Sequence, residues 1–128
     1  MGSAEDALRA RNTAAEAEKR QQEEPLKRQI NELWTQIRAE GPSAMERLAQ
    51  QNYPGGQLVG PAGEERARWE VGRFVRPTQE ASPVAPVYLY SDGTVKCEDG
   101  HGVLKYMERT SQIQQLTIIL GYIKNYPR

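Results

Sequence analysis

The residues with the greatest potential for chemistry lie together in the segment Cys97-Glu98-Asp99-Gly100-His101, which holds the only cysteine and the only histidine of the chain. A thiolate and an imidazole can bind a transition metal, and a Cys–His pair can act as an activated nucleophile. A structural zinc ion needs four ligands, however, and a nucleophilic pair needs a third group to orient its base. The strands expected here place Cys97 and His101 on opposite faces. The sequence therefore predicts no catalytic residue, no metal site and no cofactor.

A second set of candidate residues is a local cluster of arginines. Basic side chains beside exposed aromatic rings are typical of nucleic-acid-binding surfaces. The chain carries 17 Lys and Arg against 17 Asp and Glu, and this balance opposes strong affinity for phosphates. Nucleic-acid binding is therefore the alternative function. Its candidate residues are Arg66, Arg68, Arg73 and Arg76.

The strands that position these residues are predicted from two Asp-Gly pairs, Asp92-Gly93 and Asp99-Gly100, within one apolar stretch. Asp-Gly favours the two-residue hairpin turn, because Gly readily adopts positive φ and Asp tolerates it. Two such turns predict three consecutive antiparallel strands. Their register gives a core face and an exposed face that carries Lys96 and Lys105. The core face then holds Tyr88, Tyr90, Val95, Cys97, Leu104 and Tyr106. Tyr88 and Tyr90 could stack on bases only if these faces were inverted.

A further strand is predicted from Trp69 to Val75, with Gly72 at a bulge or a close approach. Residues 76–86 contain three prolines and are expected to form a loop. The final helix spans about residues 111–125, capped by Thr110-Ser111. Close packing against the sheet or another helix would explain Gly121 within it.

The first half of the chain is predicted to be helical. Residues 1–24 are a polar arm of strong helix formers. Pro25 suits the first turn of a helix over residues 25–39, which Gly41-Pro42 ends, and Ser43 begins a second short helix. Residues 25–53 therefore read as a helical hairpin, and the Gly- and Pro-rich residues 54–67 read as a linker.

The helix over residues 25–39 carries an apolar stripe at helical spacing, which is typical of a face packed in a core or in a partner's groove. We predict this stripe as the partner-binding surface. Its residues are Leu26, Ile30, Leu33, Trp34 and Ile37.

The fold expected is α+β: an N-terminal helical arm and helical hairpin, then a four-stranded antiparallel β-meander over residues 68–128 backed by a C-terminal helix. Residues 25–128 are expected to share one core. The function expected is non-enzymatic, that of an adaptor, inhibitor or assembly component. It would bind another protein, or a second copy of itself, through the N-terminal helices. The single cysteine and the lack of a long apolar run favour a cytoplasmic protein with no membrane partner.

Overall fold

The computed structural model describes residues 3–53, 55–76 and 83–127, with the side chains of the first helix described from residue 23 onward. It confirms the α+β class, with four antiparallel strands in the order β1-β2-β3-β4 within the described chain. The elements are α1 (Ser3–Gln50), β1 (Gln57–Val59), β2 (Arg66–Val75), β3 (Val84–Tyr90), β4 (Val95–Cys97), α2 (Val103–Tyr106) and α3 (Arg109–Lys124).

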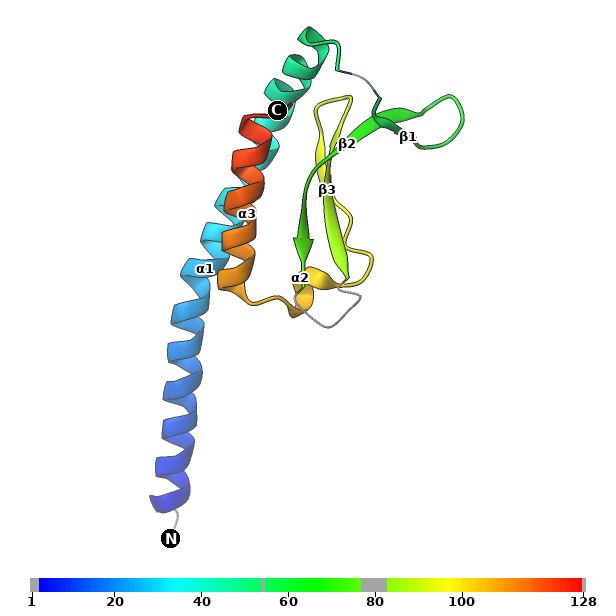
Figure 1. The fold of residues 1–128 in the computed structure, drawn as a ribbon. Coiled ribbons are helices and arrows are strands. Elements are labelled where there is room, and N and C mark those ends of the chain that lie inside the picture. The colour runs from blue at the N-terminus through cyan, green and yellow to red at the C-terminus, as the bar shows by residue number, and fades with distance from the viewer. Residues whose placement is uncertain (1–2, 54, 77–82, 128) are drawn as a thin grey trace.

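The two long helices, α1 and α3, lie side by side and cover one face of the sheet, with α3 next to β2 (Figure 1). The core between these layers is built from aliphatic side chains and one phenylalanine, Phe74. The N-terminal half of α1 continues past the end of α3 and projects from the body (Figure 1). Among the described residues, no helix lies on the opposite face of the sheet (Figure 1). The fully buried core residues include Ile37, Ala44, Phe74, Val87, Leu89, Leu116 and Ile123.

The predicted helical hairpin over residues 25–53 is wrong, because α1 runs without a break through both Pro25 and Pro42. Ser43 therefore begins no second helix. The buried residues Ile37, Ala44 and Leu48 follow at spacings of seven and four, which keeps them on the single face that packs against α3. This packing outweighs the local tendency of Gly41-Pro42 to end a helix.

The helix instead ends after Gln50, at Asn52, which adopts a positive φ of 49°. The N–H of Tyr53 donates to the carbonyl of Leu48, and the N–H of Asn52 donates to that of Ala49. These two hydrogen bonds form a Schellman motif that satisfies the last carbonyls of α1.

The predicted linker over residues 54–67 is also wrong in part. It contains β1 and the first residues of β2, which pair with each other through Leu58 and Ala67. The strand expected from Trp69 to Val75 is confirmed within β2, and its register shifts between Glu70 and Gly72. A Cβ on Gly72 would lie 2.7 Å from Cγ1 of Ile119, so the predicted bulge is also a close approach to α3.

The Asp92-Gly93 turn lies where it was predicted, but its loop has three residues, Ser91 to Gly93, rather than two. Leu89 pairs with Val95, and the N–H of Tyr90 donates to the carbonyl of Thr94. This one-residue change exchanges the two faces of β3. Val87 and Leu89 are buried in the core, so the assignment of Tyr88 and Tyr90 to the core face was wrong.

The second predicted hairpin, at Asp99-Gly100, does not form. The carboxylate of Asp99 instead accepts hydrogen bonds from the N–H groups of Val103 at 2.6 Å and Leu104 at 3.1 Å. These bonds satisfy the first free N–H donors of a short helix, α2, where a strand was expected. Tyr106, at the end of this helix, is exposed, so its assignment to the core face was also wrong. Residues 76–86 are not a single loop either, since β3 begins at Val84, and residues 77–82 lie outside the described chain.

The C-terminal helix is confirmed as α3, but Thr110 and Ser111 do not cap it, because it begins after Glu108. Gln112, which is buried in its first turn, donates its amide to the carbonyls of Leu104 and Met107. Gly121 has open space around it, so the expected close packing there is wrong.

Candidate protein-binding groove at the sheet edge

The segment with the most reactive residue types is not arranged as a reactive site. Cys97 is half-buried at the end of β4, and burial, with the charges of Asp99 and Glu98, raises the pKa of its thiol to about 11. His101 is exposed in the following turn, and the Asp99 carboxylate is engaged by α2. Within the described ranges no three Cys, His, Asp or Glu side chains gather as a set of metal ligands.

The four arginines predicted as a basic patch each have an intramolecular contact. Arg66 pairs with Asp92 at 2.6 Å and Arg73 pairs with Glu70 at 2.9 Å. Arg68 pairs with Glu98, and the guanidinium of Arg76 lies 5.0 Å from the ring centre of Tyr106. Three of the four positive charges are therefore offset by neighbouring carboxylates.

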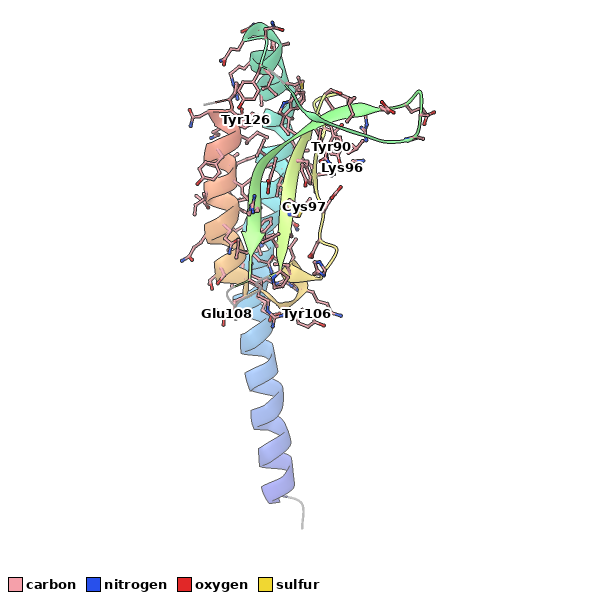
Figure 2. The ribbon with its side chains drawn as sticks, turned by 45° about the vertical axis from the view of Figure 1, so that its right-hand side comes forward. Tyr90, Lys96, Cys97, Tyr106, Glu108 and Tyr126 are labelled. Atoms are coloured by element: carbon pink, nitrogen blue, oxygen red, sulfur yellow. The ribbon has the colours of Figure 1, made fainter. Side chains whose placement is uncertain are left out.

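Tyr88 and Tyr90 lie on the face of the sheet that carries no described helix, rather than on the core face that was predicted. This is the arrangement that stacking of these rings on nucleic-acid bases would require. The guanidinium of Arg68 lies 3.8 Å from the ring centre of Tyr88, and that of Arg66 lies 4.6 Å from the ring centre of Tyr90. Tyr90 and Lys96 lie close to each other on this part of the sheet (Figure 2). Tyr90 is buried, so the protein's own side chains cover its ring.

The stripe predicted to bind a partner is divided by the fold. Ile30 and Ile37 are buried in the protein's own core, so neither is available to a partner in this structure. Leu26 is half-buried and lines a hollow with Leu104 and Met107. Leu33 and Trp34 are half-buried against the core.

Trp34 has two environments. One part of the side chain packs into the molecule, where its ring centre lies 5.9 Å from that of Phe74. Trp34 also lines an open hollow of about 630 Å³ between α1 and β4. Arg38, one turn further along α1, places its guanidinium 5.6 Å from the centre of the Trp34 ring. We call this hollow the β4-edge groove; its residues are Trp34, Arg38, Thr94, Val95, Lys96 and Cys97.

The backbone of β4 gives the groove a row of hydrogen-bonding groups. On the β3 side, Tyr90 donates to Thr94 and Glu98 donates to Pro86. Because hydrogen bonding alternates along an antiparallel strand, the N–H and C=O groups of Val95 and Cys97 point away from β3. β4 is the last strand of the sheet in the described chain, so these four groups have no strand partner.

On the far side of the sheet, the outer side of β2 is protected by contrast, and the edge strand is the three-residue β1. β1 pairs with β2 from Arg66 to Arg68, and a bulge follows at Glu70 to Gly72. At the end of β2, the side-chain amide of Gln115 accepts from the N–H of Val75 at 3.0 Å and donates to its carbonyl at 3.1 Å. The pairing with β1, the bulge and the hydrogen bonds of the Gln115 side chain, which take the place of a neighbouring strand, each discourage the addition of another strand to β2.

The sequence predicted Trp34 as a binding residue, but it did not predict which other residues line the groove with it. Arg38 was detectable, because residues four apart on a helix are neighbours. Thr94 and Lys96 were not, because only the three-dimensional fold brings the β3–β4 hairpin beside α1.

In the helices that the structure describes, no segment is both long and apolar enough to span a membrane. Comparison of the chain with protein-family models, with curated proteins and with solved structures finds no match.

Proposed function

We propose that this protein is a non-enzymatic interaction protein, an adaptor, inhibitor or assembly component, that binds another protein at the β4-edge groove. The observation that carries the proposal is the position of Trp34, half-buried and lining an open hollow beside an unpaired strand edge. A side chain held from behind by Phe74 loses little further conformational freedom when a partner covers it.

The composition of the groove supports the same proposal. Trp and Arg are enriched among the residues that dominate binding energies, and Trp34 and Arg38 lie together here. The apolar side chain of Val95 and the half-buried Cys97 also line the groove, and Lys96 beside them is exposed. An apolar centre with a charged rim is the usual anatomy of a protein interface.

The alternative function, nucleic-acid binding, is favoured by one observation: Tyr88 and Tyr90 lie on the helix-free face with Arg66 and Arg68. The ion pairs of those arginines weigh against it, because each offsets a charge that would otherwise contact phosphate. A titration of the protein with single-stranded DNA and RNA at increasing salt tests this alternative directly.

The proposed function is tested by site-specific photo-crosslinking in cells. A photoreactive residue at Thr94, inside the groove, should capture a defined protein, whereas one at Glu64, in the exposed turn after β1, should not. The captured protein is then purified, and its affinity is measured for the wild-type chain and for Arg38→Glu. We expect at least a tenfold loss of affinity, the scale of a disrupted interface anchor. If the captured protein bound the wild-type chain and Arg38→Glu with equal affinity, the groove would be rejected as the binding site.

A further inference from the structure

We infer that the occupant of the β4-edge groove is an extended segment of a partner protein, alternating apolar and acidic residues, that adds to β4 as a fifth strand. This inference rests on the proposed function and specifies the chemistry of the partner. It combines three features of the groove: the unpaired backbone of β4, the Trp34 ring that lines the groove and the cations Arg38 and Lys96.

The backbone sets the mode of binding. The outward N–H and C=O groups of Val95 and Cys97 can exchange hydrogen bonds with two residues of an incoming strand that lie directly opposite them. β4 is only three residues long, so main-chain bonding alone gives a weak complex. The side chains of the added segment must therefore supply most of the affinity and all of the specificity.

The faces of β4 set the pattern of those side chains. Residues of the added strand opposite Val95 and Cys97 point to the helix-covered face, where Trp34 lines the groove. Apolar side chains suit these positions. The residues between them point to the other face, beside the exposed Lys96. The segment expected is thus apolar at alternate positions and polar between them.

Lys96 makes those intervening residues acidic, and Arg38 on α1 adds a second cation on the helix-covered side of the groove. Arg38 and Lys96 are both exposed, and neither forms an ion pair with any carboxylate in the described part of the chain. On the neighbouring sheet surface, Arg66 and Arg68 are already paired with Asp92 and Glu98. Carboxylates on the partner would complement the two unpaired cations and speed association.

A second copy of this chain fits the same edge poorly. If two β4 strands paired antiparallel about their common centre, Lys96 would lie directly opposite Lys96 of the other copy. Like charges at directly opposed positions destabilise a strand pair. The groove therefore suits a partner of opposite charge rather than a homodimer.

The experiment uses a fluorescein-labelled heptapeptide of alternating glutamate and valine, Glu-Val-Glu-Val-Glu-Val-Glu, with blocked termini. One comparison peptide carries lysine in place of glutamate. Another carries N-methyl groups on the valine amides, which removes the donors that would pair with β4 but keeps the side chains. Binding to the full chain is measured by fluorescence anisotropy. The amides of ¹⁵N-labelled protein are followed by NMR.

We expect micromolar binding of the glutamate peptide, with the largest NMR shifts at Val95 and Cys97. N-methylation, lysine substitution and the double variant Arg38→Glu/Lys96→Glu should each weaken binding by about tenfold or more, because each removes a main-chain or charge contact. The matched control, Arg28→Glu/Lys105→Glu, reverses two exposed charges outside the groove and should change affinity less than about twofold.

Equal binding of the N-methylated peptide would overturn strand addition, and NMR shifts confined to β1 and the outer side of β2 would overturn the choice of edge. Tighter binding of single-stranded DNA than of the peptide, lost in the Arg38→Glu/Lys96→Glu variant, would assign the cations to phosphate instead. If the peptide fails to bind while the photo-crosslinked protein still requires Arg38, the occupant is a folded surface. The extended-segment inference then fails and the proposed function stands.

Discussion

Gly41 in α1 lies directly against Gly93 in the β3–β4 turn: a Cβ on Gly41 would sit 2.2 Å from the carbonyl oxygen of Gly93 and 3.0 Å from Cγ2 of Val95. Gly93 in turn has a φ of +85° and would bring its own Cβ to 3.2 Å from Cα of Pro42. Two glycines facing each other thus allow the hairpin to approach the helix. The same approach forms the β4-edge groove, because it brings β4 beside Trp34.

Gly41→Ala should destabilise the protein, because the added methyl group meets backbone that has little room to move. We expect a loss of about 1–3 kcal/mol in the free energy of unfolding, the usual cost of overpacking. Gly121→Ala is the matched control, since Gly121 lies in α3 with open space around it. That substitution should stabilise the protein by about 0.5–1 kcal/mol through helix propensity. Urea denaturation of both variants measures the difference, and equal effects would contradict the close contact.

The Gly41–Gly93 contact also explains why the helical hairpin was predicted wrongly. Gly-Pro ends most helices when only the local sequence is considered, and that signal is strong at Gly41-Pro42. Here the glycine serves a contact with a turn more than fifty residues away in sequence, and the buried stripe through Ala44 and Leu48 continues the helix. No local pattern contains this information, whereas the bulge at Gly72 could be predicted because it interrupts a visible strand pattern.

The faces of β3 illustrate a different limit. The position of the turn at Asp92-Gly93 followed from residue types, but a loop of three residues is as compatible with Gly93 as a loop of two. That single residue decides whether Tyr88 or Leu89 enters the core. The groove depends on this register and on the α1 contact, so sequence reasoning reached Trp34 without reaching its neighbours.

Trp34→Ala should reduce both stability and partner binding, since Trp34 packs on Phe74 and lines the groove. Full burial of a Trp is worth about 3–5 kcal/mol, and for this half-buried ring we expect a loss of about 2 kcal/mol. Trp34→Phe should recover most of the stability but not the affinity for the captured partner, because Phe is shorter at the groove end. Thermal denaturation and titration calorimetry separate the two effects. Unchanged stability in Trp34→Ala would contradict the packing described.

Arg47→Met should loosen the end of α3. Nε of Arg47 donates to the carbonyl of Tyr126 at 2.9 Å, and an Nη donates to that of Ile123 at 2.7 Å. A cation at a helix C-terminus can bond the last carbonyls and complements the helix dipole. We expect a loss of about 1–3 kcal/mol, as for hydrogen bonds to charged groups. Faster amide exchange should be confined to the last turn of α3. Arg28→Met, at an exposed position of α1, the helix that also holds Arg47, should have little effect on stability or on amide exchange.

Val95→Lys and Lys96→Val test the register of β4. Val95 is 5% exposed, and a lysine there would bury an unpaired ammonium group, at a cost of about 3 kcal/mol or more. Lys96 is exposed, and its replacement by valine should change stability by less than about 0.5 kcal/mol. Circular dichroism during urea denaturation measures both. A tolerated Val95→Lys would mean that the strand is displaced by one residue.

The thiol of Cys97 should be nearly inert at neutral pH and should make stability fall at high pH. Burial raises its pKa from 9.0 to about 11, so the unfolded chain loses this proton more readily than the folded protein. The folded state binds the proton more tightly, and its contribution is complete below pH 9. That contribution is lost as the pH rises from about 9 toward 11. The difference in unfolding free energy between wild type and Cys97→Ala should therefore shrink across this window, with other titrating groups cancelling in the comparison.

Reaction with a disulfide reagent at pH 7.5 should be slow in buffer and fast in urea, because the thiolate is the reactive form. Rapid labelling of the native protein would show that Cys97 is open to solvent and would return its segment to consideration as a reactive site.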